Sequence, residues 1–148
     1  MENLSNFVET LQDLMLVKNV TPANIHKDTK ISLNVIYGWF RKVNIPKLNS
    51  LIVLSDYFEC SIDYLCGRTE HNFFNKSLNP STFSERFRLL IDKKKVTRRK
   101  LSAGAKISTG CIQRFLTDTG KPLLDNLIRL ANFFECSLDY LLGLSDDV

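Results

Sequence analysis

Hydrophobic residues in the second half of the chain recur with the spacing of a short amphipathic helix. Over residues 83–91 they fall at positions that lie on one face of an α-helix. The residues of this face are Phe83, Phe87, Leu90 and Ile91. Thr82 and Glu85 fit a capping box, in which the hydroxyl and the carboxylate satisfy free backbone amides reciprocally. The pattern therefore predicts a helix that begins after Thr82 and ends near the lysine run 93–95.

Four more helices are predicted after this one. Thr97, Ser108 and Ser137 are each placed to cap a helix, and Gly120 separates the third helix from the fourth. The residues predicted to face the core are Leu101 and Ala105, then Cys111, Ile112 and Phe115, then Leu124, Leu127, Ile128, Ala131 and Phe134, and finally Leu138, Leu141 and Leu142. Because no strand-like alternation occurs anywhere in the chain, the sequence predicts an all-α protein.

The sequence also repeats itself at an offset of 76 residues. The segment 58–65 returns almost unchanged as 134–141, and Val20-Thr21 aligns with Val96-Thr97 in the same register. The alignment of residues 7–70 with 83–146 needs no gap. A register that holds over this length indicates a duplicated small domain.

The first copy shows the same order of helices. Asn6 and Glu9 stand at its predicted capping box, Pro22 opens the second helix after Thr21, and Ser32 caps the third. Trp39 takes the core position of a phenylalanine in the second copy. Each copy is therefore predicted to consist of five short helices.

The repeat sets the expected domain boundaries. We expect a first domain over residues 1–70, a linker over 71–82 and a second domain over 83–148. The linker is polar and contains the pair Phe73-Phe74, whose rings we expect to pack on a neighbouring domain. Twelve residues can extend over at most about 40 Å.

Each copy resembles the helix-turn-helix domain of the phage-repressor and Cro family, also called the XRE family. The residues that carry the resemblance are Val96-Thr97, Leu101-Ser102, Ile107-Ser108, Ile112, Arg114-Phe115, Lys121-Pro122, Leu127, Leu130 and the segment 137–143. The resemblance covers nearly the whole chain apart from the linker. It implies an all-α fold of two tandem five-helix, lambda-repressor-like helix-turn-helix domains.

The resemblance also implies binding to double-stranded DNA. In this fold a recognition helix enters the major groove with its N-terminal residues at the base edges, and here these helices would span about residues 33–41 and 109–116. The groove-facing residues would be Ser108, Thr109, Gly110, Gln113 and Arg114 in the second copy, and Ser32, Leu33, Asn34, Tyr37 and Gly38 in the first. Gln113 and Asn34 carry amides that can bond adenine, and Thr109 can touch a thymine methyl group.

Charge distinguishes the two copies. Residues 1–70 carry seven Lys or Arg and eight Asp or Glu, a net charge of −1, whereas residues 83–148 carry twelve against eight, a net charge of +4. Seven cations occur between residues 93 and 106 with no acid among them: Lys93, Lys94, Lys95, Arg98, Arg99, Lys100 and Lys106. We call residues 93–106 the basic segment. A run of charge is often only a solvated face, but beside a recognition helix this one favours phosphate binding.

The first copy departs from the family pattern at its expected DNA face. Its basic residues there are Lys18, Lys27, Lys30, Arg41 and Lys42. The family often has glutamine at the start of the second helix, where this chain has Pro22 and Arg98, and the proline removes a backbone amide. The family's glycine after the recognition helix is replaced by Lys42 and Asp118. We therefore expect the second copy to supply most of the DNA contact.

Composition excludes several other classes of protein. Apolar residues make up 44% and charged residues 24% of the 148-residue chain, as in soluble globular proteins. No apolar run approaches the ~20 residues of a membrane span, and the first residues do not form a basic secretory signal. Four cysteines without an export signal indicate free thiols in a reducing cytoplasm.

The sequence does not suggest an enzyme or a metalloprotein. His26 and His71 are the two histidines, and neither lies near a cysteine or a pair of carboxylates. Cys60 and Cys66 lack the C-x-x-C spacing, and no cysteine and histidine set suits zinc. No phosphate-binding glycine motif is present. We therefore expect no catalytic residue, no metal and no cofactor.

Two functions fit these patterns. The first is a sequence-specific transcriptional regulator, a repressor of a bacterium or mobile element, in which two covalently joined copies act as a pseudo-dimer on unlike half-sites. The low charge of the first copy leaves a second arrangement open, in which two chains form a homodimer through the first domain. The alternative function is a protein-interaction module, antirepressor-like or antitoxin-like, in which one or both copies do not bind DNA.

Overall fold

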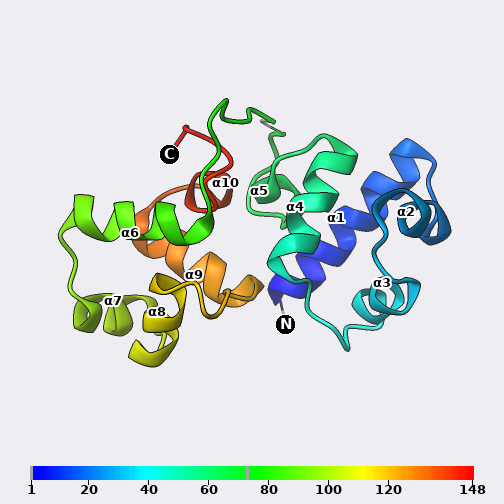
Figure 1. Cartoon of the computed structure of the whole chain (residues 1–148). Coiled ribbons are helices and arrows are strands. Elements are labelled where there is room, and N and C mark those ends of the chain that lie inside the picture. Colours follow the sequence, from blue (N-terminus) through cyan, green and yellow to red (C-terminus); the bar gives the residue numbers. More distant parts are fainter. Residues whose placement is uncertain (1, 73) are drawn as a thin grey trace. The chain divides into compact units, whose positions relative to one another are not determined.

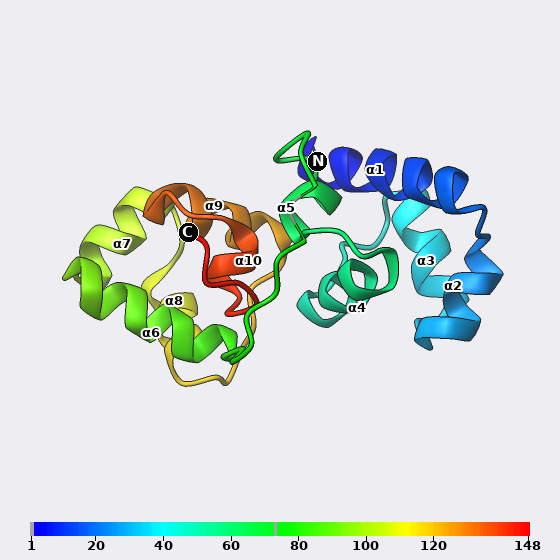
Figure 2. The same cartoon turned by 90° about the horizontal axis from the view of Figure 1, so that it is seen from above.

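A computed structural model describes residues 2–72 and 74–148. The described residues form ten α-helices and no strand, which confirms the all-α prediction. The chain divides into two compact units, Met1–Phe74 and Asn75–Val148. Figures 1 and 2 show the helices of both units.

Each unit contains five helices among the described residues. The first unit has α1 (Glu2–Lys18), α2 (Pro22–Thr29), α3 (Leu33–Phe40), α4 (Leu48–Phe58) and α5 (Ile62–Leu65). The second unit has α6 (Phe83–Lys94), α7 (Arg98–Ala105), α8 (Thr109–Leu116), α9 (Leu124–Phe134) and α10 (Leu138–Leu141). From α2 onward, every helix of the first unit begins and ends 76 residues before a helix of the second.

The backbone between the helices repeats in the same way. Ten described residues have a left-handed φ, and they form five pairs separated by 76 residues: Asn19 and Lys95, Lys30 and Lys106, Lys42 and Asp118, Glu59 and Glu135, Gly67 and Gly143. Lys42 has a φ of 59° and Asp118 a φ of 58°, which explains why the family places glycine at this position. The repeat in sequence is thus also a repeat in backbone conformation.

The start of the first helix was predicted wrongly. Asn6 and Glu9 do not cap α1, because this helix already begins at Glu2. Leu4 is 3% exposed and extends the buried face of α1 by one turn, whereas the second unit has Pro80 at the equivalent position and its helix begins only at Phe83. A buried leucine in one copy and a proline in the other therefore give the two first helices different lengths.

The predicted caps of the second unit are confirmed, with one change of detail. The hydroxyls of Thr97, Ser108 and Ser137 each accept a hydrogen bond from a backbone amide of the first turn that follows. Thr82 also caps its helix. The carboxylate of Glu85 accepts a bond from the Thr82 hydroxyl at 3.1 Å, whereas the capping box predicted a bond from a backbone amide.

The caps of the first unit differ from those predicted. A reciprocal capping box occurs at Thr21 and Asn24, where the sequence pattern had not indicated one. Ser32 stands at the N-cap position of α3 without a side-chain bond to the helix. The third helix of the first unit therefore begins without the cap that Ser108 provides in the second.

Aromatic rings occupy the core of each unit. In the second, Phe87 lies 5.3 Å from Phe83, 6.2 Å from Phe115 and 6.3 Å from Phe134 between ring centres. In the first, Trp39 is fully buried against Phe7 at 5.5 Å, as its alignment with a phenylalanine predicted. These contacts tie the third helix of each unit to the first.

Two residues expected on the core side are less buried than predicted. Ile91 and Cys111 are both only partly buried, because each lies at the edge of its helix face. Ile112 and Phe115 are buried as expected. The buried stripe of α8 is therefore narrow.

Several residues of the predicted linker form hydrogen bonds within one unit or the other. Asn72 accepts a bond from the Ser61 amide at 2.9 Å and belongs to the first unit, while the Asn75 side chain donates to Asp147 of the second at 2.8 Å. Phe73 lies outside the described residues, and Phe74 is 38% exposed. Asn72 and Asn75 are therefore each bonded within their own unit.

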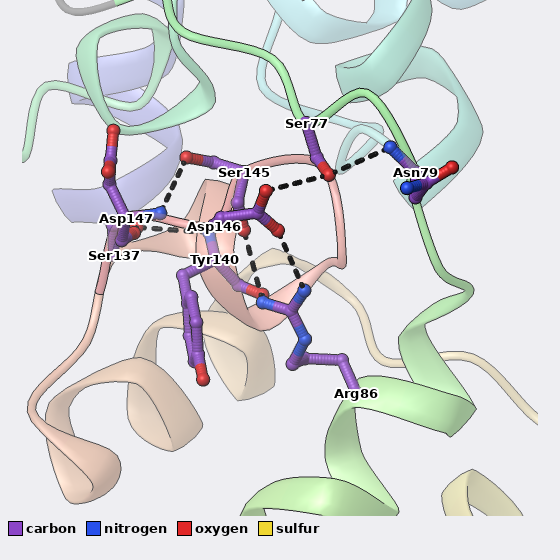
Figure 3. Close-up of polar contacts among 8 residues, drawn as sticks. All are labelled: Ser77, Asn79, Arg86, Ser137, Tyr140, Ser145, Asp146 and Asp147. Atoms are coloured by element: carbon purple, nitrogen blue, oxygen red, sulfur yellow. Dashed lines mark hydrogen bonds and ion pairs between the residues drawn. The ribbon is translucent and has the colours of Figure 1, made fainter.

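A buried arginine holds the C-terminal segment of the second unit. Arg86, on α6, is 7% exposed and donates to the carbonyl oxygens of Tyr140 at 2.6 Å and Ser145 at 3.1 Å. Its guanidinium lies 4.1 Å from the centre of the Tyr140 ring, and Nη2 lies 3.9 Å from the Asp146 carboxylate. Figure 3 shows Arg86 reaching from its helix into this group. Residues 140–146 are thus fastened to α6.

The start of the second unit runs beside the same segment. The Ser77 amide donates to the Leu144 carbonyl at 2.8 Å, and the Ser81 amide donates to the Gly143 carbonyl at 3.0 Å. Gly143 has a φ of 76°, and a Cβ there would lie 2.3 Å from the Ser81 carbonyl oxygen. Glycine is therefore required at 143 both by the backbone and by the close approach of Ser81.

Candidate nucleic-acid interface

Helices α7 and α8 are joined by a three-residue turn that directs α8 outward. Lys106 ends α7 in the left-handed conformation, Ile107 is buried, and Ser108 caps α8. The Ser102 hydroxyl donates to the Ile107 carbonyl at 2.6 Å and so ties the turn to α7. Figure 1 shows the two short helices side by side along α6 and α9.

The core holds α8 by its inner face and leaves its N-terminal face free. Ile112 is fully buried, and the Ser84 hydroxyl of α6 donates to the Phe115 carbonyl at 2.7 Å. Thr109 and Gln113 are exposed, and no atom lies within 4 Å of the place where a Cβ of Gly110 would be. The first turns of α8 therefore present an open polar surface.

Every residue of the second unit predicted to touch DNA is exposed. This set comprises Arg98, Arg99, Lys100, Lys106, Ser108, Thr109, Gly110, Gln113 and Arg114. The first three stand in the first turn of α7, where Thr97 caps the Lys100 amide at 3.1 Å. The first amides of a helix have no partner within the helix, so cations and free amides occur together at this end of α7. This arrangement suits an anionic ligand.

A comparison with known protein families identifies the type of domain in the second unit. Residues 87–141 match the family described as "Helix-turn-helix". The second unit contains an XRE-type helix-turn-helix domain. This result confirms the predicted resemblance for the second unit, and the matched residues include α7 and α8.

One curated relative supports the same assignment. An "Uncharacterized HTH-type transcriptional regulator YobD" of Bacillus subtilis (strain 168) is 34% identical over 65 residues. The match covers 44% of this chain and 58% of the relative, so the chain spans little more than half of that protein's length. No solved structure matches the chain.

The described residues show neither a membrane helix nor a metal cluster. No helix in the described part of the chain is long and apolar enough to cross a bilayer. Residues 2–72 and 74–148 likewise contain no group of three His, Cys, Asp or Glu side chains that could hold a metal. The helix-turn-helix family is a family of DNA-binding regulators rather than enzymes.

The first unit presents a different surface on its third helix. Ser32 and Asn34 are exposed and Leu33 is partly buried, while Tyr37 is 44% exposed and lies against Phe40. Beside them Val43 is 68% and Ile45 37% exposed, where the helix-turn-helix domain of the second unit has Thr119 and Lys121. In the first unit the predicted groove residues thus stand beside exposed apolar side chains.

The second helix of the first unit carries an acidic residue, Asp28. The Tyr57 hydroxyl donates to the Asp28 carboxylate at 2.7 Å. This hydrogen bond, together with burial, raises the pKa of Tyr57 to about 12. The helix-turn-helix domain has Gly104 and Phe133 at the two equivalent positions. A polar pair between α2 and α4 is therefore replaced by packing of a ring over glycine between α7 and α9.

One cysteine lies on the open face of α8. The Ser108 hydroxyl and the Arg114 guanidinium, whose Nη2 lies 3.2 Å from Sγ, lower the pKa of the Cys111 thiol below its usual value. Cys60, Cys66 and Cys136 are buried. A thiol of lowered pKa reacts faster near neutral pH because more of it is thiolate.

Iodoacetamide is therefore expected to alkylate Cys111 of the native protein first. Mass spectrometry of peptides after timed labelling at pH 7 would measure the order of reaction. Unfolding the chain in denaturant should bring all four cysteines to similar rates. Equal labelling of Cys111 and the three buried cysteines in the folded protein would contradict the exposure and activation of Cys111.

Proposed function

We propose that this protein is a sequence-specific DNA-binding transcriptional regulator that acts as a repressor in the cytoplasm and performs no catalysis. The observation that carries the proposal is the exposed N-terminal face of α8 on a helix-turn-helix domain that also carries the seven cations of the basic segment. This combination provides both phosphate neutralisation and an edge that can read bases. Bound at a promoter, such a domain represses by occupying the DNA.

The roles of the side chains follow from their places on the two helices. Arg98, Arg99, Lys100 and Lys106 bind the phosphates on either side of the groove. Ser108, Thr109, Gln113 and Arg114 face the base edges, and Gly110 allows the backbone to approach them. The corresponding residues of the first unit, Ser32, Leu33, Asn34 and Tyr37, make a smaller contribution because cations are fewer there.

Selection of bound duplexes from a random pool by the full chain tests this function. Retention on heparin and its dependence on salt would first measure the electrostatic part of binding. Recovery of a defined motif supports a sequence-specific regulator. Equal binding to all duplexes would reject sequence specificity, and no binding to DNA would favour the alternative of a protein-interaction module. The exposed apolar residues Tyr37, Val43 and Ile45 are the observation that favours that alternative for the first unit.

The proposed regulator can bind one DNA site as a single chain or as two chains. In the pseudo-dimer both units of one chain bind unlike half-sites, whereas in the homodimer two chains join through the first unit and read a symmetric site. Footprint length on the selected motif, measured together with the stoichiometry of the complex, distinguishes them. One chain over two half-sites supports the pseudo-dimer, and two chains over a palindrome support the homodimer.

Replacing Gln113 by alanine is expected to relax the selected motif at one base pair. A bidentate amide contact with adenine is worth about 1–3 kcal/mol of discrimination, which the alanine variant loses. Repeating the selection with the variant measures this change, and Thr117→Ala, at an exposed position at the end of α8, provides a control. An unchanged motif would show that Gln113 does not read a base.

A further inference from the structure

Arg114 lies across a glycine that the backbone does not require. A Cβ at Gly120 would be 3.3 Å from Cβ, 3.6 Å from Cδ and 3.7 Å from Nε of Arg114. Gly67 and Gly143 are the described glycines with a left-handed φ, so Gly120 has a conformation that other residues can adopt. A side chain at 120 would therefore press against the arginine stem and require it to shift by a few tenths of an ångström.

Three further hydrogen bonds involve Arg114, two at its backbone carbonyl and one at its guanidinium. The amides of Thr119 and Gly120 donate to the Arg114 carbonyl at 3.0 Å and 3.3 Å, which folds the loop back onto the end of α8. At the other end of the side chain, Nη2 donates to the Cys111 sulfur at 3.2 Å. Cys111 is one turn nearer the start of α8, so the guanidinium is directed toward the N-terminal end of the helix.

The first unit has the opposite arrangement at the same two positions. There Gly38 corresponds to Arg114 and Asn44 to Gly120. The Val43 and Asn44 amides donate to the Gly38 carbonyl at 2.9 Å and 3.2 Å, so the loop has the same backbone bonds. A Cβ at Gly38 would lie 2.0 Å from Nδ2 of Asn44. In each unit a glycine at one position makes room for the larger side chain at the other.

We propose that Gly120 and Cys111 hold Arg114 in position as the side chain that reads a guanine in the site of the second unit. This inference rests on the proposed function. Arginine bonded to O6 and N7 of guanine is the commonest specific contact in the major groove, and a side chain held in place loses less entropy on binding. The first unit, with Gly38 covered by Asn44, presents no cation there.

A mutant cycle on the full chain tests the inference, with the duplex selected by the wild-type protein as the probe. Arg114→Ala is expected to lower affinity for that duplex about 10- to 100-fold and to relax the motif at one G·C pair. Gly120→Val is expected to lower affinity comparably, because a β-branched side chain cannot turn both methyl groups away from the arginine. Adding Gly120→Val to Arg114→Ala should cause little further loss.

The folding of each variant is followed by thermal unfolding. The double replacement Arg114→Gly with Gly120→Asn recreates the pair of the first unit. It is expected to remain folded, with an unfolding temperature about 4–8 °C below the wild type because of the helix glycine, and to bind as weakly as Arg114→Ala. Wild-type affinity in a folded Gly120→Val variant, or additive losses in the cycle, would overturn the positioning role. Uniform weakening by Arg114→Ala, with an unchanged motif, would overturn the reading of guanine. Failure of the wild-type chain to select any motif would instead reject the proposed function itself.

Discussion

Replacing Arg98 and Arg99 together by glutamate is expected to weaken binding to every duplex, selected or random, by about 10- to 100-fold at physiological salt. Both side chains are exposed in the first turn of α7, beside the free amides that favour anions there. Each phosphate contact that is lost should lower the slope of log K against log salt by about 0.9. Affinities measured between 50 and 200 mM salt would give both quantities for the same variant.

A matched charge reversal in the first unit provides the control. Lys27→Glu with Lys30→Glu changes the net charge by the same amount on α2 and its cap, and both lysines are exposed. We expect this pair to cost less affinity and to change the salt slope less, because the basic segment lies in the second unit. Equal losses from the two pairs would show that both units bind phosphates, and no loss from Arg98 and Arg99 would show that the basic segment is only a solvated face.

Replacing Arg86 by alanine is expected to destabilise the second unit by about 3 kcal/mol. The variant leaves the carbonyl oxygens of Tyr140 and Ser145 without their charged donor in a buried place, and it also removes the cation from the Tyr140 ring. For a unit of this size the loss corresponds to a fall of more than about 10 °C in unfolding temperature. Denaturant and thermal unfolding of the full chain would measure both.

The neighbouring arginine is the natural control for this experiment. Arg88→Ala changes an exposed residue of the same helix and should alter stability by no more than about 0.5 kcal/mol. Arg86→Lys keeps the charge but cannot reproduce the planar fork of donors, so we expect an intermediate loss. If Arg86→Ala were as mild as Arg88→Ala, the C-terminal segment would not depend on this arginine.

The repeated helices and most of their caps could be predicted because their causes are local. A cap such as Thr97 or Ser108 acts on an amide three residues away, and the stripe that includes Phe87 and Phe115 follows from helical periodicity. The alignment at an offset of 76 residues then allowed each helix predicted in one copy to be predicted in the other. The basic segment could be recognised because its charged residues are close together in the sequence. At Asn6 the capping pattern predicted a later start, but α1 already begins at Glu2 and includes the buried Leu4.

The contact between residues 114 and 120 could have been inferred from the alignment of the two copies. Gly38 with Asn44 and Arg114 with Gly120 exchange a large and a small residue at the same two positions, which is the pattern expected of side chains in contact. The sequence of one copy alone does not indicate that two positions six residues apart are in contact. It does not show that the loop after the third helix folds back onto that helix. The backbone bonds to the Arg114 and Gly38 carbonyls supply that knowledge.

The sequence by itself determined the all-α class, the order of helices and the place of the basic face, because periodicity, capping and charge runs depend on neighbours along the chain. Only the tertiary structure decided which polar residues are buried and which are held in position. Arg86 resembles any surface arginine in sequence, but its carbonyl partners are 54 and 59 residues away. The hydrogen bonds of Asn72 and Asn75 likewise depend on partners in the folded units. Such contacts form only when the core brings distant segments together.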